Sequence, residues 1–289
     1  MPLSANACEL QQMKRVLPVV LVLLASATVL NAQKPRQPPS SRPAVGAPAG
    51  TATPRGAAAS ERTVPFKPGE TLTYDVSWSN FLTAGTATVS VVEKKPSFGS
   101  VAYYITAEGR PTPLLSRLYS LYYKIDTLVD VYTLLPQRGS AYSEENGRRR
   151  MKVTRFNQAA RTADYEVQTA TVSRRGMSLP AFTQDALSAL FVLRALGLKQ
   201  GEKMTIPVAD GGAIYRAALS VGAPEAVKTG IGSLTALRIT PTITDERGRL
   251  VGRNLALWVS TDARRLPVKL RADLTVGSFN LVLKSASGS

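Results

Sequence analysis

FKPGETLTYDVSWSNFLTAGTATVSV, residues 66–91, carries the clearest secondary-structure signal in this chain of 289 residues. Apolar side chains occupy alternate positions in both halves of the stretch: Leu72, Tyr74, Val76 and Trp78, then Ala87, Val89 and Val91. A β-strand has a side-chain period of two, so each run presents one apolar face and one polar face. Pro68-Gly69 predicts a turn before the first run, and the polar break between the runs predicts an antiparallel hairpin.

The same alternation continues through most of the chain after residue 63 and predicts about a dozen strands. One turn, Glu144-Glu145-Asn146-Gly147, contains the Asn-Gly pair that is typical of tight hairpins. Because strands and helices do not alternate, the pattern favours an antiparallel sheet, an open barrel or a sandwich. We predict a mainly β fold, with one curved antiparallel sheet that forms an open β-barrel-like domain around a buried helix.

Residues 182–198 break the alternation and predict that helix. The middle of the segment is apolar nearly all round, which is typical of a buried helix. Thr183 is the predicted N-cap, Asp185 places a negative charge in the first turn, and Gly197 ends the helix. We expect this helix to lie across the concave side of the sheet, and a second, shorter helix to occupy part of residues 114–121.

Four sequence motifs, in the same order, resemble the domain of unknown function (DUF) 3108 family of exported bacterial proteins. They are Phe66-x-x-Gly69-Glu70-x-Leu72-x-Tyr74 with Trp78 and Ala84-Gly85; DALSALFVLR with Asp185, Ser188 and Arg194; GSLTALRITP with Gly232, Arg238 and Pro241; and LWVSTDARRLPVKLRADLTVG with Trp258, Ser260, Asp262, Pro267 and Gly277. Together they span nearly all of the chain after residue 65. The resemblance implies an exported, β-rich domain and no particular reaction.

The N-terminal part of the chain predicts export. In residues 1–32, Lys14-Arg15 precede an apolar run that ends in small residues, which is typical of a secretory signal. The run is far shorter than the roughly 20 residues that span a bilayer, although a retained membrane anchor is the alternative. We expect cleavage after Ala32, with Ala27 as the alternative, and a periplasmic or secreted mature protein.

The rest of the chain divides into a linker and a domain. Residues 33–62 are rich in Pro, Ala, Gly and Ser and carry one large aliphatic residue, so they predict a disordered linker. Residues 63–289 contain no second linker and predict a single β-rich domain.

Composition excludes much of the usual enzyme chemistry. The chain contains no histidine and one cysteine, Cys8, which precedes the apolar run of the signal. Ser-His-Asp and Cys-His nucleophile systems need an imidazole base, and zinc sites need Cys or His ligands. We therefore predict no catalytic residues, no metal site and no cofactor.

A candidate ligand cavity is assigned to five residues of the family motifs: Asp185, Ser188, Arg194, Trp78 and Trp258. In the functional interpretation the three helix residues are polar groups on the floor of a cavity. The structural interpretation is favoured, because a charge near a helix N-terminus and helix-to-loop hydrogen bonds need no ligand. The two tryptophans are likewise expected in the core.

A candidate anion-binding hairpin follows the Asn-Gly turn and consists of Arg148, Arg149, Arg150, Lys152 and Arg155. The net charge of +16 favours acidic partners, and export makes an anionic envelope polymer or a membrane surface a better partner than nucleic acid. The alternative is a solvated hairpin whose charges discourage edge pairing.

Two carboxylate pairs, Glu70 with Asp75 and Asp126 with Asp130, are interpreted as solvated side chains. The second pair lies roughly 13 Å apart along a strand, too far for glycoside hydrolysis. We therefore expect an exported envelope protein that binds or scaffolds a lipidic or hydrophobic ligand without catalysis. The alternatives are a surface interaction protein that contacts anionic envelope components and, with the least support, a cell-envelope hydrolase.

Overall fold

The computed structural model describes residues 60–79, 82–118, 120–251, 253–274 and 277–289. The predicted signal, residues 33–59 of the predicted linker, residues 80–81 in the break of the predicted hairpin and residue 119 in the predicted short helix lie outside the described residues. None of the helices within the described ranges has the length and hydropathy of a membrane span.

Fourteen strands and two helices make up the described chain. The strands are β1 (Thr71–Trp78), β2 (Leu82–Ser97), β3 (Ser100–Pro111), β4 (Leu121–Asp130), β5 (Pro136–Glu145), β6 (Arg148–Asn157), β7 (Thr162–Gln168), β8 (Val172–Ser178), β9 (Lys203–Asp210), β10 (Ala213–Thr229), β11 (Gly232–Asp245), β12 (Arg253–Ser260), β13 (Pro267–Leu274) and β14 (Gly277–Ser287). The helices are α2 (Pro113–Leu118) and α3 (Ala186–Leu196).

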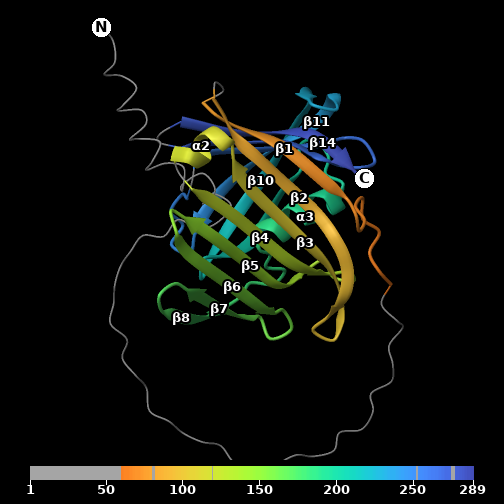
Figure 1. Ribbon diagram of the computed structural model, residues 1–289. Helices are drawn as coiled ribbons and strands as arrows, with labels where there is room; N and C mark the ends of the chain where they lie inside the picture. Colours follow the sequence, from red (N-terminus) through yellow and green to blue (C-terminus); the bar gives the residue numbers. More distant parts are fainter. Residues whose placement is uncertain (1–59, 80–81, 119, 252, 275–276) are drawn as a thin grey trace, which may run out of the picture.

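All fourteen strands belong to one sheet, in the order β8-β7-β6-β5-β4-β3-β2-β1-β14-β13-β12-β11-β10-β9. Every neighbouring pair is antiparallel, and β8 and β9 are the edges of a sheet that is not closed. In Figure 1 this sheet curves around α3, as predicted from the alternation. The mainly β class and the open, barrel-like antiparallel sheet are confirmed.

The strand order fixes which turns lie together. Because neighbouring strands are antiparallel and nearly follow sequence order, the connections after β1, β3, β5, β7, β9, β11 and β13 all lie at one end of the sheet. This end carries α2 and is called the α2 end (Figure 1). The remaining connections, and the entry into β1, lie at the opposite end.

The predicted hairpins are confirmed. In the first hairpin Leu72 lies opposite Val89 and Tyr74 opposite Ala87, so the apolar positions of both runs share one face. The β5–β6 turn places Asn146 at φ 47 and Gly147 at φ 79, the left-handed backbone that a two-residue hairpin turn requires.

Helix α3 is shorter than predicted and begins at a different N-cap. Asp185, not Thr183, is the N-cap, with extended backbone at φ −90 and ψ 173. Ser188 decides between them, because its hydroxyl accepts from the Asp185 N–H and completes a capping box. The predicted C-terminal residue is correct, since Gly197 is in the left-handed region at φ 62.

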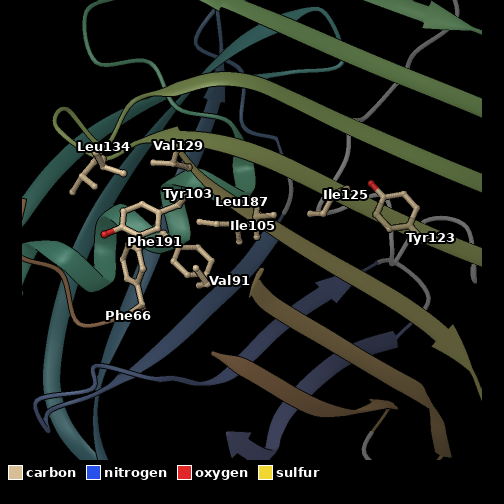
Figure 2. Packing of buried hydrophobic residues seen from close by; sticks show 11 residues of the cluster. Phe66, Val91, Tyr103, Ile105, Tyr123, Ile125, Val129, Leu134, Leu187 and Phe191 are labelled. Atoms are coloured by element: carbon tan, nitrogen blue, oxygen red, sulfur yellow. The ribbon is translucent and has the colours of Figure 1, made fainter. Parts of the chain in front are cut away.

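The core lies between α3 and the concave face of the sheet. Phe191 of α3 packs edge-on against Phe66, with ring centroids 4.8 Å apart, and Phe66 packs against Tyr103 of β3 (Figure 2). Leu193 belongs to a second cluster, with Ile239 and other apolar residues of β9 to β12. The helix is therefore held by both halves of the sheet.

The ordered domain includes the last residues of the predicted linker. The Arg62 side chain donates from Nε to the Tyr132 carbonyl oxygen at 3.0 Å, and Glu61 pairs with Lys94. Contacts with the sheet thus begin by residue 61.

Candidate ligand sites at the two ends of helix α3

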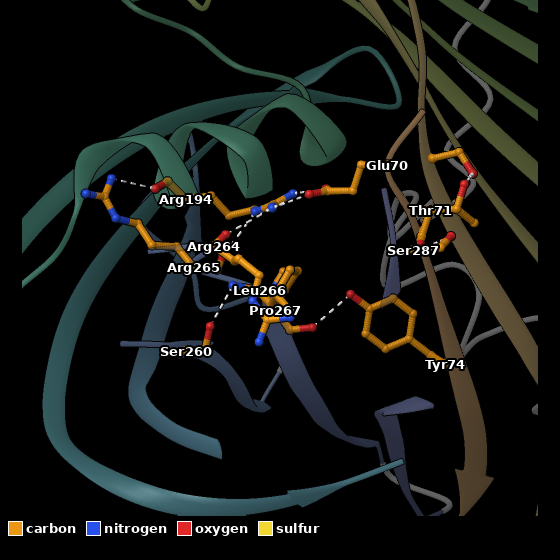
Figure 3. Close-up of polar contacts among 11 residues, drawn as sticks. Glu70, Thr71, Tyr74, Arg194, Ser260, Arg264, Arg265, Leu266, Pro267 and Ser287 are labelled. Atoms are coloured by element: carbon orange, nitrogen blue, oxygen red, sulfur yellow. Dashed lines mark hydrogen bonds and ion pairs between the residues drawn. The ribbon is translucent and has the colours of Figure 1, made fainter. Parts of the chain in front are cut away.

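A buried ion pair fixes the C-terminal half of α3 to the entry of β1. Arg194 donates from Nη1 and Nη2 to the two carboxylate oxygens of Glu70, at 2.6 and 2.9 Å (Figure 3). The two side chains are 0% and 1% exposed. The guanidinium carbon lies 5.4 Å from the ring centroid of Phe66 and 5.2 Å from that of Phe191. A bidentate pair between aromatic rings is a favourable arrangement for a buried arginine.

The β12–β13 connection completes this network. Arg194 also donates to the carbonyl oxygens of Arg264 and Arg265, at 3.1 and 3.0 Å. In return Arg265 donates from Nη1 to the carbonyl oxygens of Arg194 and Ala195, at 3.1 and 3.0 Å (Figure 3). A cation at the last carbonyls of a helix satisfies acceptors that have no partner within the helix. The C-terminus of α3 is thus tied to the sheet in both directions.

Tyr74 of β1 also contacts the β12–β13 connection. Its hydroxyl donates to the Pro267 carbonyl oxygen at 2.8 Å, and burial raises the pKa of Tyr74 far above its usual value. The Leu266 N–H donates to the Ser260 hydroxyl at 2.7 Å. Three of the four family motifs therefore meet in one network.

A pocket of about 190 Å³ with both polar and apolar walls lies beside this network, at the C-terminal end of α3; we name it the apolar pocket after its aliphatic side chains. Its apolar lining comes from the helix end and from the concave face of β11 and β12: Leu193, Leu198, Leu237, Ile239 and Val259. Ser260, Thr261 and Arg265 form its polar side. An engineered apolar cavity of about 150 Å³ is enough to bind benzene, so this pocket has room for a small hydrophobic group.

A smaller cavity of about 50 Å³ lies at the N-terminal end of α3; its walls are partly apolar, and we name it the polar cavity after the charged side chains that line it. Its lining includes Asp185 of the helix cap, Lys152 and Thr154 of β6, Tyr165 of β7 and Asp210 at the end of β9. Since one water molecule needs a cavity of about 10–15 Å³, this cavity has room for a few waters or one small polar group.

Burial changes the acidity of groups in the polar cavity. Desolvation raises the pKa of Asp185 from 3.8 to about 6, against hydrogen bonds from Thr127, Leu187 and Ser188 that favour its charged form. Asp185 is only partly buried as a residue, and it lines the cavity. Desolvation also lowers the pKa of Lys152, although the charge of Asp210 acts in the opposite direction.

The five residues of the predicted ligand cavity are not brought together. Asp185 lines the polar cavity, whereas the Ser188 hydroxyl forms part of the helix cap and Arg194 forms the ion pair with Glu70. Trp78 stacks on Phe279 with ring centroids 6.3 Å apart, and Trp258 is buried, with its indole N–H donating to Glu225.

The five residues of the basic hairpin lie on two faces of one strand. Lys152 lines the polar cavity, so the alternate residues Arg148 and Arg150 share its inward face. Arg149 and Arg155 face outward; Arg149 lies opposite Glu144 and pairs with its carboxylate at 3.3 Å. All four arginines are exposed.

Sequence reasoning missed Glu70 and Arg265. The interpretation of Glu70 as a solvated side chain is wrong, because it is 1% exposed and paired with a residue 124 positions away. The signal was available in Arg194, a charge on an otherwise apolar helix that requires a partner when buried. Asp130, of the second carboxylate pair, is also buried, at 8% exposure, and binds the hydroxyls of Ser100 and Thr133.

No group of three or more Asp, Glu, His or Cys side chains within the described ranges could hold a metal ion. A curved antiparallel sheet around one helix, with a pocket at each end of that helix, defines an open, barrel-like β protein. The fold agrees with a solved structure described as a β-barrel-like protein of domain of unknown function DUF1849 from Brucella abortus. The two share 10% identity at a TM-score of 0.54, over 78% of this chain and 99% of that chain.

The chain belongs to the family described as protein of unknown function (DUF3108), whose model matches residues 73–284. The resemblance seen in the four motifs is thereby confirmed. No curated protein matches the chain.

Two further solved structures are similar over most of their length at lower TM-scores. One is described as an exported protein with a YmcC-like fold from Bacteroides fragilis, with 11% identity and a TM-score of 0.34 over 79% of this chain and 100% of that chain. The other is described as a lipoprotein from Parabacteroides distasonis, with 8% identity and a TM-score of 0.35 over the same shares.

Proposed function

We propose that this protein is an exported, non-catalytic binding protein of the cell envelope, and that it holds a small hydrophobic group in the pocket at the C-terminal end of α3. The observation that carries the proposal is the group of five aliphatic side chains on one wall of that pocket: Leu193, Leu198, Leu237, Ile239 and Val259. The secretory signal predicted for residues 1–32 supports the envelope location.

The size of the pocket limits the ligand. Between this pocket and the polar cavity, the helix–sheet interface is filled by packed side chains such as Phe66, Phe191 and Ile105. By proportion with a cavity of about 150 Å³ that holds six ring carbons, about 190 Å³ admits roughly eight carbons. The ligand is therefore a short apolar molecule or the end of a longer chain.

Arg265 favours a negatively charged or strongly polar head on that ligand. Arg265 lines the pocket, and its Nη1 donates to carbonyl oxygens of α3. Nη1 accounts for both of the hydrogen bonds that its guanidinium group makes to described residues. Guanidinium groups bind carboxylates and phosphates through several parallel hydrogen bonds. A carboxylate-headed alkyl chain fits both halves of the pocket.

A chain-length series tests this assignment. We expect the affinity for straight-chain carboxylates, measured by isothermal titration calorimetry, to rise about fourfold per methylene up to roughly eight carbons, because each buried methylene contributes about 0.8 kcal/mol. Octylammonium should bind at least tenfold more weakly than octanoate. A flat series, or equal affinity for the two heads, would contradict the proposal.

Two tryptophan variants supply a matched pair for the same titration. Leu198→Trp fills the pocket and should weaken octanoate binding at least tenfold. Leu196→Trp adds the same side chain two residues away, where Leu196 is 53% exposed, and should leave binding unchanged. Native mass spectrometry of the parent protein from its own envelope would then identify the bound molecule.

A further inference from the structure

Two connections of the sheet hold an exposed phenylalanine in the left-handed region of the backbone. Phe98, between β2 and β3, has φ 48, and Phe182, between β8 and α3, has φ 63. A bulky aromatic residue rarely adopts this conformation, because its Cβ crowds the following carbonyl oxygen and the fold becomes less stable. The side chains are 66% and 73% exposed, so packing against the described chain offsets little of this cost.

The β5–β6 turn shows which residue this backbone geometry favours. Asn146-Gly147 has φ values of 47 and 79, and Phe98-Gly99 has nearly the same pair, 48 and 78. Asparagine is a favoured first residue of such a two-residue turn. At Phe98 the chain therefore has an unfavourable residue that faces water, and backbone strain of this kind is concentrated at functional positions.

Hydrogen bonds fix the Phe98 turn to the next connection at the same end of the sheet, opposite the α2 end (Figure 1). Ser100, two residues after Phe98, donates from its hydroxyl to Asp130 Oδ2 at 2.6 Å. Gln137, at the start of β5, donates from Nε2 to the same oxygen at 3.2 Å. The Phe98 turn is thus held in place relative to the β4–β5 connection.

The same line of contacts continues to Phe182. Gln158, in the β6–β7 connection, donates from Nε2 to the carbonyl oxygens of Pro136 and Thr183, at 3.2 and 3.0 Å. Thr183 directly follows Phe182. The two phenylalanines therefore lie on one continuous rim, which extends from β3 to β8 over roughly 24 Å at about 4.8 Å per strand.

This rim also has cations without a counter-charge. Arg161, in the β6–β7 connection between the two phenylalanines, and Lys67, at the entry into β1, are exposed. Neither side chain takes part in an ion pair with a carboxylate of the described ranges. The β2 lysines nearest Phe98 are paired with carboxylates, so they add no net charge. Anionic lipid headgroups attract free cations of this kind.

We propose that this rim binds the surface of an anionic lipid bilayer, with the Phe98 and Phe182 side chains inserted below the headgroups. Two apolar side chains at this separation are too far apart for one small ligand and fit a broad, flat partner. Insertion gives each ring the apolar burial that the folded chain does not provide, and the cations add attraction to the headgroups. The proposal is independent of the ligand assigned to the apolar pocket.

Asparagine variants test the proposal without damaging the fold. Phe98→Asn with Phe182→Asn introduces at both positions a residue that tolerates the left-handed backbone, so the melting temperature should stay the same or rise. Binding of the purified chain to phosphatidylglycerol vesicles, measured by cosedimentation, should weaken at least tenfold. Unchanged vesicle binding by this variant, or no vesicle binding by the parent, would overturn the proposal.

Two leucines at the α2 end supply a matched control. Leu114 and Leu250 are 67% and 71% exposed, so Leu114→Gln with Leu250→Gln removes comparable apolar surface from the other end of the sheet. This variant should change vesicle binding less than twofold. A loss as large as that of the phenylalanine variant would show that exposed apolar surface in general, and not this rim, contacts the vesicles.

The lipid headgroup decides the electrostatic part of the proposal. Phosphatidylcholine vesicles should bind at least fivefold more weakly than phosphatidylglycerol vesicles, and Arg161→Gln should weaken binding to the latter several-fold. Equal binding to both lipids would overturn the assignment of an anionic bilayer.

Discussion

The two ends of α3 bury charge in different ways. At the C-terminal end Arg194 is neutralised by the opposite charge of Glu70 in a bidentate pair, and both side chains are almost completely buried. At the N-terminal end Asp185 has no cationic partner in its hydrogen bonds and is held by Thr127 and the backbone N–H groups of Leu187 and Ser188. One end is a rigid anchor beside an apolar pocket, and the other is a titratable cap beside a polar cavity.

The difference shows how one helix can serve two kinds of site. Removing either partner of a buried ion pair leaves the other charge buried without compensation, which lowers the stability of the fold. The pair therefore holds the helix in one position. A carboxylate that is held by hydrogen bonds alone can exchange a proton without losing all of its contacts. We therefore expect the two ends to respond differently to mutation and to pH.

The largest effect is expected at the anchor. Arg194→Met leaves the Glu70 carboxylate buried without a cation, which should lower the free energy of unfolding by about 3–5 kcal/mol. Urea denaturation followed by circular dichroism measures this loss. The double variant Glu70→Leu with Arg194→Met is the control, because replacing both charges should restore most of the stability; a double variant as unstable as the single one would contradict the role of the pair.

The pH response of the other end comes next in size. Because the pKa of Asp185 is raised to about 6 in the folded state, the folded chain holds its proton more tightly than the unfolded chain. The stabilisation is complete below the unfolded pKa of about 4 and is lost as the pH rises through 6, with a total of at most about 3 kcal/mol.

Asp185→Asn isolates this contribution, since asparagine is also a good N-cap and does not titrate. The free energy of unfolding of the parent, minus that of the variant, should fall between pH 4 and pH 7 in urea denaturation. A difference that stays constant over this range would show that Asp185 does not titrate as its burial indicates.

The smallest effect concerns the cap at the C-terminal end. Arg265→Gln removes two hydrogen bonds to carbonyl oxygens of α3 near the protein surface, and about 1 kcal/mol of stability should be lost. The same variant should weaken octanoate binding at the adjacent pocket several-fold. If stability falls but binding is unchanged, Arg265 is a helix cap alone and does not contact the ligand.

Sequence reasoning recovered what depends on local periodicity. The first hairpin, the Asn146-Gly147 turn and the end of α3 at Gly197 follow from alternation and from residues that favour a left-handed backbone. The N-cap was misplaced by two residues because Thr183 and Asp185 are both good caps, and the choice depends on Ser188 three residues later.

The sites depend on contacts between distant segments, which periodicity does not reveal. Glu70 and Arg194 are 124 residues apart, and neither has a local partner that would indicate their pairing. The two faces of β6 could have been separated by parity, but the sequence does not say which face is concave. Lys152 therefore could not be distinguished from Arg149 until the position of α3 was known.

The assignment of the apolar pocket at the C-terminal end of α3 is tested most directly by methyl NMR of the full chain during titration with octanoate. We predict saturable shift changes for the methyl groups of Leu193, Leu198, Ile239 and Val259, and none for those of Ile125 beside the polar cavity. Absence of shifts at the first group, or equal shifts at both ends of the helix, would contradict the assignment.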